Sequence, residues 1–167
     1  DFENAQKFIE TAIKKISPVT DPFDSSQTYS TAADIYFDIK NFEKALSYAQ
    51  KSLEIVKNSM PEDYSSLSAN YMHVGNLFYY VGKLEDTIKN YQLAEQFELK
   101  CPHPDSDMIQ LLQMRIGTVL TELERFDEAE KIFTELLNQY LRLYPENHPK
   151  VEEIKSLVQK ARRLKEK

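Results

Sequence analysis

The stretch that decides the fold is residues 71–97, YMHVGNLFYYVGKLEDTIKNYQLAEQF. It predicts two amphipathic helices joined by a short turn at Gly82 and Lys83, because small and apolar residues recur at helical spacing on both sides of that turn. The same residue types recur at the same offsets before and after this stretch. The chain is therefore predicted to be an array of helical repeats.

The repeats follow one another at a step of 42 residues. Four aligned sets share this step: Ala33, Gly75 and Gly117; Phe42, Leu84 and Phe126; Ala45, Thr87 and Ala129; Ala49, Tyr91 and Phe133. The Gly or Ala of the first set is expected to let the first helix of each pair approach the second, because large side chains pack against small ones at helix interfaces. The spacing thus predicts antiparallel helix pairs in close contact.

This pattern resembles the tetratricopeptide repeat (TPR), a helix–turn–helix unit that usually has 34 residues. The longer step, and the links PHPD at residues 102–105 and PENHP at residues 145–149, are similar to the longer repeat subtype of kinesin light chains. The resemblance covers almost the whole chain. It implies an all-α fold, in which antiparallel helix pairs form a right-handed superhelix (a TPR α-solenoid) of about eight helices with a C-terminal capping helix.

The register divides a single predicted TPR domain, residues 1–167, into parts. These are the second helix of a truncated repeat (1–16), three repeats (26–58, 62–99 and 106–143) and a capping helix (149–165). The prolines are expected in the links, because proline breaks helices, except that Pro149 suits a first helical turn capped by Asn147 or His148. Because the chain opens in mid-repeat, we expect it to be a fragment of a longer protein with at least one more helix upstream.

Composition excludes several classes of function. The net charge of −6 disfavours a nucleic-acid partner, which needs a basic surface. The single cysteine, Cys101, excludes an internal disulfide and favours a reducing, cytoplasmic location. No signal peptide pattern is visible, and no apolar run approaches the ~20 residues of a membrane span.

Catalytic and metal-binding patterns are not found in the sequence. His73, His103 and His148 do not form ligand pairs with metal-site spacing, and Cys101 and His103 share a proline-rich link. Residues 103–105 spell the His-Pro-Asp tripeptide of J-domain co-chaperones, but the repeat register accounts for them as a link. We therefore expect no enzymatic activity, no cofactor and no metal.

In TPR arrays the first helices of the repeats line a concave groove that binds peptides. The resemblance places these residues in the groove: Asp34, Phe37, Asp38, Met72, His73, Asn76, Tyr79, Tyr80, Met114, Arg115, Thr118 and Glu122. Aromatic anchors and flexible methionines suit a peptide-binding surface. The alternative that the tyrosines and methionines pack between neighbouring repeats stays open.

Two known TPR ligand types do not fit this groove. Chaperone-binding TPR domains hold a terminal carboxylate with a clamp of Lys, Asn and Arg, but here acidic Asp34 faces the groove, Leu111 replaces a clamp lysine and only Arg115 matches. The adjacent asparagines of kinesin light chains are also replaced. Asp34, Asp38 and Glu122 instead favour a ligand with basic character.

The leading hypothesis is a non-catalytic protein–protein interaction module, a scaffold or adaptor that binds a peptide segment of a partner protein. Two alternatives remain open. One is a structural array that self-associates or docks neighbouring domains. The other is a regulatory TPR segment of a larger enzyme. The sequence leaves the oligomeric state undetermined.

Overall fold

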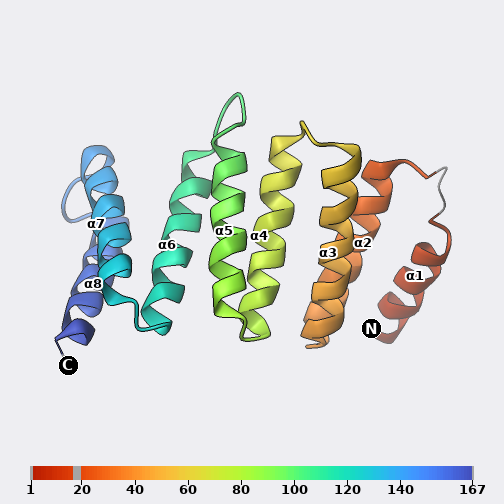
Figure 1. Cartoon of the computed structure of the whole chain (residues 1–167), viewed down its shortest axis with the longest axis horizontal. Helices are drawn as coiled ribbons and strands as arrows, with labels where there is room; N and C mark the ends of the chain where they lie inside the picture. The colour runs from red at the N-terminus through yellow and green to blue at the C-terminus, as the bar shows by residue number, and fades with distance from the viewer. Residues whose placement is uncertain (1, 17–19, 167) are drawn as a thin grey trace. The chain divides into compact units, whose positions relative to one another are not determined.

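The computed structural model describes residues 2–16 and 20–166, which form eight α-helices and no strand (Figure 1). The predicted all-α class is confirmed. In chain order the helices are α1 (Phe2–Lys14), α2 (Pro22–Asp38), α3 (Phe42–Ser59), α4 (Tyr64–Tyr80), α5 (Leu84–Glu98), α6 (Ser106–Glu122), α7 (Phe126–Leu143) and α8 (Pro149–Lys165). None of these helices combines the length and the apolar character that crossing a bilayer requires.

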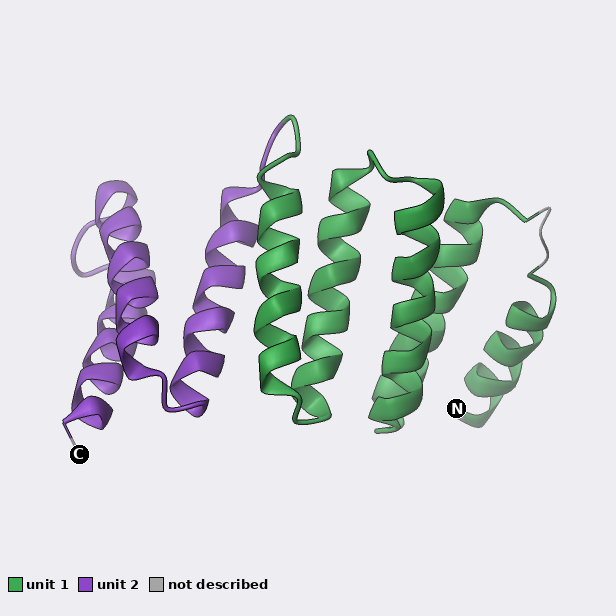
Figure 2. Ribbon diagram, viewed as in Figure 1, with its two compact units in different colours: residues 1–102 green, residues 103–167 purple. Residues whose placement is uncertain are grey.

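The helices fall into two compact units, Asp1–Pro102 and His103–Lys167 (Figure 2). In unit 1, α2 packs antiparallel to α3 and α4 antiparallel to α5, while α3 contacts α4 and α1 contacts α2. In unit 2, α7 packs against both α6 and α8. Each unit therefore has its own core between helix pairs.

One backbone turn closes all three helix pairs. Lys40, Gly82 and Glu124, spaced by 42 residues, have φ values of 61°, 75° and 59°. The amide after each of them donates a 2.9 Å hydrogen bond to the carbonyl five residues earlier, as Lys83 N does to Phe78 O. A left-handed residue of this kind ends a helix and reverses the chain. The turn predicted at Gly82 and Lys83 is therefore present, and its geometry repeats with the sequence period.

Small residues allow the paired helices to approach, as the alignment predicts. A Cβ atom built on Gly75 would lie 2.7 Å from the ring of Tyr91, and one on Gly117 would lie 2.5 Å from the ring of Phe133. Both distances are shorter than a van der Waals contact. In these two pairs, the aromatic side chain of the second helix lies directly against the backbone of the first.

The start of α2 differs from the sequence-based expectation. The helix begins at Pro22 rather than near residue 26, because the side chain of Asp21 accepts hydrogen bonds from Phe23 N at 2.8 Å and Asp24 N at 3.4 Å. Proline suits the first helical position, where its missing amide hydrogen is not needed. Pro22 therefore starts the helix instead of marking a link.

The C-terminal helix α8 begins as predicted, with His148 as its N-cap: His148 Nδ1 accepts a hydrogen bond from Lys150 N at 3.3 Å. Its apolar stripe is buried against α7 and consists of Val151, Ile154, Val158 and Ala161. One apolar face with polar residues elsewhere is the pattern expected of a capping helix.

The basic end of α8 forms ion pairs with the acidic start of α7. Arg162 Nε donates to Glu130 Oε1 at 2.6 Å, and Lys165 Nζ donates to Asp127. The side chains of Arg162, Lys165 and Asp127 are half or more exposed, so solvent screens these pairs and they contribute little to stability.

Candidate functional site

The residues predicted to line the groove lie on α2 and α4 of unit 1 and on α6 of unit 2. Every one of them is at least partly exposed. Unit 2 contributes Met114, Arg115, Thr118 and Glu122, all on α6. The remaining predicted residues belong to unit 1, where their contacts define a candidate site.

The structure brings some of the unit 1 residues together and separates others. Facing side chains of α2 and α4 approach each other at two points, where His73 contacts Asp34 and where Tyr80 contacts Phe37. Asp38 lies one turn beyond Asp34 on the same side of α2, because residues four apart share a helix face. We call this surface between α2 and α4 the α2–α4 face.

Met72, Asn76 and Tyr79 lie on a different flank of α4. Each residue of an α-helix is rotated by about 100° from the previous one, which turns these three side chains away from α2. Asn76 Oδ1 accepts a 2.7 Å hydrogen bond from the hydroxyl of Tyr91 on α5. The resemblance to TPR arrays places all of them in one groove, and in the structure they lie on two flanks of α4.

His73 occupies the middle of the α2–α4 face and joins its two helices. Its Nε2 lies 3.3 Å from Asp34 Oδ1, and its Nδ1 lies 3.5 Å from Ser30 Oγ. A neutral imidazole with hydrogen on Nε2 can donate to the carboxylate and accept from the hydroxyl at the same time. These contacts fix the ring, while most of the Asp34 side chain (68%) remains exposed.

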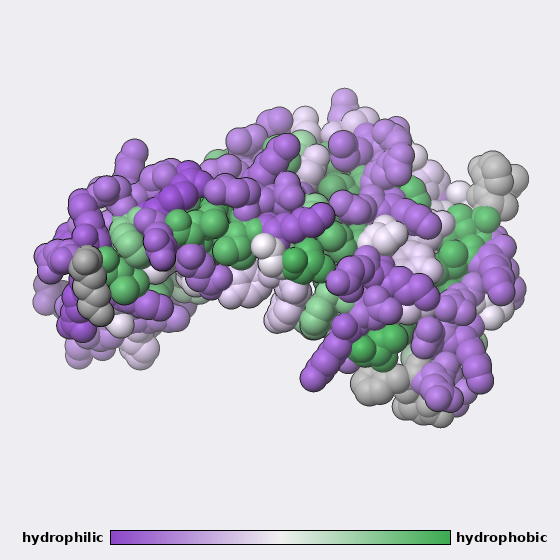
Figure 3. Space-filling view, turned by 60° about the horizontal axis from the view of Figure 1, so that its bottom comes forward, coloured by the Kyte–Doolittle hydropathy of each residue, from purple (hydrophilic) through white to green (hydrophobic). Residues whose placement is uncertain are grey.

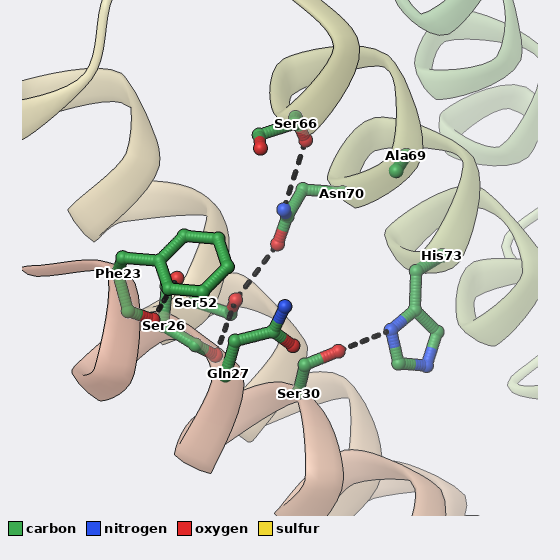
Figure 4. Close-up of a pocket in the computed structure, with 9 residues that line it drawn as sticks. All are labelled: Phe23, Ser26, Gln27, Ser30, Ser52, Ser66, Ala69, Asn70 and His73. Atoms are coloured by element: carbon green, nitrogen blue, oxygen red, sulfur yellow. Dashed lines mark hydrogen bonds between the residues drawn. The ribbon is translucent and has the colours of Figure 1, made fainter. Parts of the chain in front are cut away.

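A polar pocket of about 140 Å³ lies at the N-terminal end of the α2–α4 face (Figure 4). We call it the serine pocket. Its lining comes from α2, α3 and α4 and consists of Phe23, Ser26, Gln27, Ser30, Ser52, Ser66, Ala69, Asn70 and His73. Apart from His73, no side chain in this lining is ionisable, so the pocket offers hydrogen bonds rather than charge.

Ser52 lines the serine pocket, and its single hydroxyl hydrogen faces two acceptors. Its Oγ lies 2.9 Å from Ser26 O and 2.8 Å from Asn70 Oδ1, and both are acceptors. The amide of Asn70 is oriented by its Nδ2, which donates to Ser66 O at 2.9 Å (Figure 4). A serine hydroxyl has one hydrogen and can donate fully to only one of two acceptors. The pocket therefore has acceptor capacity for an entering N–H or O–H group.

Aromatic rings gather at the opposite, C-terminal end of the α2–α4 face. The Tyr80 ring lies 4.7 Å from Phe37, 5.1 Å from Phe42 and 5.9 Å from Tyr79, measured between centroids. We call Phe37, Phe42 and Tyr80 the aromatic patch, which Tyr79 borders from the neighbouring flank of α4. Tyr80 remains 52% exposed and Tyr79 37% exposed. Figure 3 turns this end of the helices forward and shows hydrophobic residues at the surface among hydrophilic ones.

A network of ionisable side chains in unit 1 lies away from this face and has a structural role. The Tyr36 hydroxyl donates to Glu10 Oε1 at 2.6 Å and accepts from Lys44 Nζ at 3.0 Å, which links α1 to α2 and α3. The hydrogen bond from Tyr36 lowers the pKa of Glu10, and its bond to the ammonium raises the pKa of Lys44. The pKa shifts of Glu10 and Lys44 therefore arise from the contacts that hold α1 against α2 and α3.

Two residues considered for catalysis or metal binding, Cys101 and His148, make contacts that explain their presence without a chemical role. Cys101 Sγ lies 3.7 Å from Phe97 O, and burial raises the pKa of the Cys101 thiol, which disfavours the reactive thiolate. His148 caps α8. Among residues 2–16 and 20–166, no group of three or more His, Cys, Asp or Glu side chains is arranged to hold a metal ion.

His73 of the serine pocket was predicted as a groove residue, whereas Ser52, Asn70 and Phe42 were not predicted as site residues. One sequence signal nevertheless pointed to Ser52. At the register position of Ser52, the other two repeats have Ala94 and Leu136, and all three residues are buried. A buried hydroxyl is unfavourable unless it is hydrogen-bonded, so a serine at an apolar position indicates a local polar network. The partners of that network come from other helices and could not be read from the sequence.

Comparison with known proteins agrees with this architecture. Residues 26–58, the first predicted repeat, match the tetratricopeptide repeat family model. The Arabidopsis thaliana protein KINESIN LIGHT CHAIN-RELATED 2 is 25% identical over 146 residues, which are 86% of this chain. The match covers 21% of that relative, so the chain spans about a fifth of its length.

Two solved structures show the same fold. One is a Podosopora anserina protein of nearly identical TPR-like repeats, named after kinesin light chain. It has a TM-score of 0.82 at 10% identity and covers 98% of this chain and 76% of its own. The other is the Rap conjugation gene regulator of plasmid pLS20 in complex with the Phr* peptide, with a TM-score of 0.62 at 19% identity over 98% of this chain and 46% of its own. The fold is therefore that of a TPR-like solenoid.

Proposed function

We propose that this chain is a non-catalytic protein-interaction module and that its α2–α4 face binds an extended peptide segment of a partner protein. The observation that carries the proposal is the exposed aromatic patch, with Tyr80 half exposed, on the same face as a pocket that has spare hydrogen-bond acceptors. Aromatic side chains anchor partner segments, and polar groups beside them fix orientation.

The serine pocket suits an amide group of such a peptide. Ser52 can donate a hydrogen bond to only one of its two acceptors, Ser26 O and Asn70 Oδ1. An N–H of the peptide main chain, or of an Asn or Gln side chain, would donate a hydrogen bond to the other acceptor. A carboxylate ligand has no hydrogen to donate there. This agrees with the departure of the sequence from the carboxylate clamp.

Two further observations support the proposal. The Rap regulator, whose fold this chain shares, was solved with a bound peptide, so the fold is compatible with peptide recognition. The turns at Lys40, Gly82 and Glu124 repeat at the 42-residue step, which supports assignment to the longer repeat subtype of kinesin light chains. On α6, Met114, Arg115, Thr118 and Glu122 are proposed to provide the contacts of unit 2.

The test is selection of short random peptides on the purified chain, followed by affinity measurement with Tyr80→Ser and Ser52→Val variants. We expect each variant to bind the selected peptides at least about tenfold more weakly, the loss expected for one interface anchor. Phe8→Ser is the matched control, because Phe8 is an aromatic residue of α1 that is 81% exposed. Circular dichroism must show that each variant retains its helices.

Two results would contradict the proposal. One is the absence of any enriched peptide together with concentration-dependent assembly in light scattering, which would favour the structural array. The other is an equal loss of affinity in the Tyr80→Ser and Phe8→Ser variants, which would place the ligand elsewhere. Binding at the expected face would leave open whether a larger enzyme uses the module for regulation.

A further inference from the structure

We propose that the aromatic patch, together with the exposed carboxylate of Asp38, which directly follows Phe37 at the end of α2, is a subsite for an arginine side chain of the bound segment. The inference rests on the proposed function and names the chemistry of the ligand. Its occupant is a peptide with a positively charged, planar side chain.

The ring geometry leaves aromatic surface available to a ligand. Phe42 stacks on Tyr80 with an interplanar angle of 25°, while Phe37 meets Tyr80 at 79°. These contacts brace the Tyr80 ring, yet more than half of the residue remains exposed. The face of an aromatic ring carries negative partial charge and attracts a cation. A braced, exposed tyrosine ring is therefore suited to stack with a guanidinium group.

The two ionisable side chains of α2 on this face, Asp34 and Asp38, are both acidic. Helices α2 and α4 both end here, at Asp38 and Tyr80, and neither has a basic residue in its last turn. A helix C-terminus carries partial negative charge that a nearby cation stabilises. Asp38 is exposed in the last turn of α2, and Asp34 lies one turn earlier on the same face. The ring faces and the carboxylates favour a cation, while the negative C-termini of α2 and α4 are offset by the positive N-termini of α3 and α5, which begin at the same end at Phe42 and Leu84.

Two lysines lie near this end and must be considered. Lys83 Nζ lies 5.9 Å from the centroid of the Phe78 ring, and Phe78 is rotated by about 200° from Tyr80 around α4. Lys83 is therefore directed to another side of the helix. Lys40 directly follows α2 and is exposed, so it is the cation nearest to the subsite in sequence. Its charge would weaken binding of an arginine, which gives the proposal an additional test.

Arginine fits the subsite better than lysine or an apolar side chain. Its planar guanidinium can stack on Tyr80 and form paired hydrogen bonds to the Asp38 carboxylate, whereas an ammonium group is a strongly hydrated point charge. An apolar side chain would contact the rings but leave the carboxylate without a partner. A glutamate at this position would be repelled by Asp34 and Asp38.

The distance between the two ends of the face predicts where the arginine lies in the ligand. Asn70 in the serine pocket and Tyr80 are ten residues apart on α4, which corresponds to roughly 15 Å along the helix axis. An extended peptide advances about 3.3 Å per residue, so this distance corresponds to about four or five residues. We therefore expect the arginine about four or five positions from the residue that donates to Asn70.

The experiment uses the peptides obtained by random selection on the intact chain. In each selected peptide, the arginine is replaced by citrulline, which is neutral and similar in shape, and separately by Lys and by Glu. We expect arginine to be enriched during selection and the citrulline peptide to bind about tenfold more weakly, with Lys intermediate and Glu weakest. The affinity of the arginine peptide should also fall as the salt concentration rises.

Variants of the protein then assign the effect to the subsite. Tyr80→Leu, which keeps apolar bulk, and Asp38→Asn should each reduce the difference between the arginine and citrulline peptides, while Lys40→Gln should increase it. Phe8→Leu and Asp24→Asn are matched controls on exposed positions of α1 and of the first turn of α2, and should leave it unchanged.

The possible outcomes separate the two proposals. If peptides bind the α2–α4 face but citrulline replaces arginine without loss, the arginine subsite is refuted and the proposed function stands. If the difference persists in both Tyr80→Leu and Asp38→Asn, the arginine binds elsewhere and the subsite is also refuted. If no peptide is enriched, both proposals fail together.

Discussion

The contact between Gly75 of α4 and Tyr91 of α5 gives the sharpest prediction about the fold. A Cβ atom at position 75 would lie 2.7 Å and 2.8 Å from two carbons of the Tyr91 ring. The ring is 2% exposed, and its hydroxyl donates to Asn76 at 2.7 Å. Tyr91 therefore cannot withdraw from an added methyl group without losing packing or this hydrogen bond.

The magnitude for Gly75→Ala follows from three opposing contributions. Overpacking a core costs about 1–3 kcal/mol, and loss of a hydrogen bond costs about 1 kcal/mol. Alanine in place of glycine within a helix stabilises by about 1 kcal/mol. We therefore expect Gly75→Ala to lower the free energy of unfolding by about 2 kcal/mol. In a Tyr91→Ala background the collision is absent, and the same change should raise that free energy by about 1 kcal/mol.

The assay is a double-mutant cycle of the parent chain, the two single variants and the double variant. Urea unfolding followed by circular dichroism gives the stabilities, and hydrogen exchange of the α4 and α5 amides places the change in unit 1. The expected coupling energy is about 3 kcal/mol. The reasoning would be refuted if Gly75→Ala stabilised the chain equally in both backgrounds, because the ring would then not be what excludes a side chain at position 75.

Three further predictions concern the turns, the pH dependence and the capping helix. Gly82 has a φ of 75° and no atom within 4 Å of a built Cβ, so Gly82→Ala should lower the free energy of unfolding by about 1 kcal/mol through backbone strain alone. Lys40 has a φ of 61°, so Lys40→Gly should relieve the same strain and raise the free energy of unfolding by up to about 1 kcal/mol. Urea unfolding measures both changes. The pKa of Glu10 is lowered from its ordinary value of 4.5 by the hydrogen bond from Tyr36. The contribution of Glu10 to stability is therefore present above pH 4.5 and is lost as the pH falls through the lowered pKa. Amide exchange in α1 should accelerate over that pH range in the parent chain and change less in the Tyr36→Phe variant. Ile154 is fully buried between α8 and α7, so Ile154→Ala should destabilise unit 2 by about 2–5 kcal/mol, seen as faster exchange in α7 and α8 while exchange in α4 is unchanged.

The helix pairs could be predicted from the sequence because their determinants are local and repeated. Gly75 opposes Tyr91 and Gly117 opposes Phe133, so each aromatic residue of the second helix meets a glycine of the first. In the first repeat, the residues at these two positions are both alanine and both buried. The alignment therefore records compensating pairs, and the structure shows the same pairs in contact.

The start of α2 was harder to predict because a capping side chain decided it. Residues 17–26 contain two prolines and several small polar residues, which favour a link. Asp21 can cap the helix only if the chain turns there, and Pro22 is equally compatible with a link and with a first helical turn. The outcome depended on a local hydrogen bond whose formation the composition did not reveal.

The candidate site was predictable only in part. The repeat register predicts which helix carries a residue, but it does not predict which flank of that helix the side chain occupies. Asp34 and Tyr80 lie on exposed surface, whereas Asn76, which the resemblance put in the same set, is bonded to Tyr91 of α5. Whether neighbouring side chains of one helix face the same partner depends on how the adjacent helices pack. That information lies in contacts between residues distant in sequence.

The serine pocket arises where one repeat departs from its neighbours at a core position. A helix pair needs a small or apolar residue at position 52, as Ala94 and Leu136 provide in the other repeats, because a buried hydroxyl is stable only when it is bonded. Ser52 meets that requirement through Asn70, which is partly exposed, and through the carbonyl of Ser26, which is buried. In the proposed binding mode, the bonds that make the serine tolerable in the core would also present the Asn70 acceptor to the α2–α4 face, so packing and the proposed recognition would depend on the same side chain.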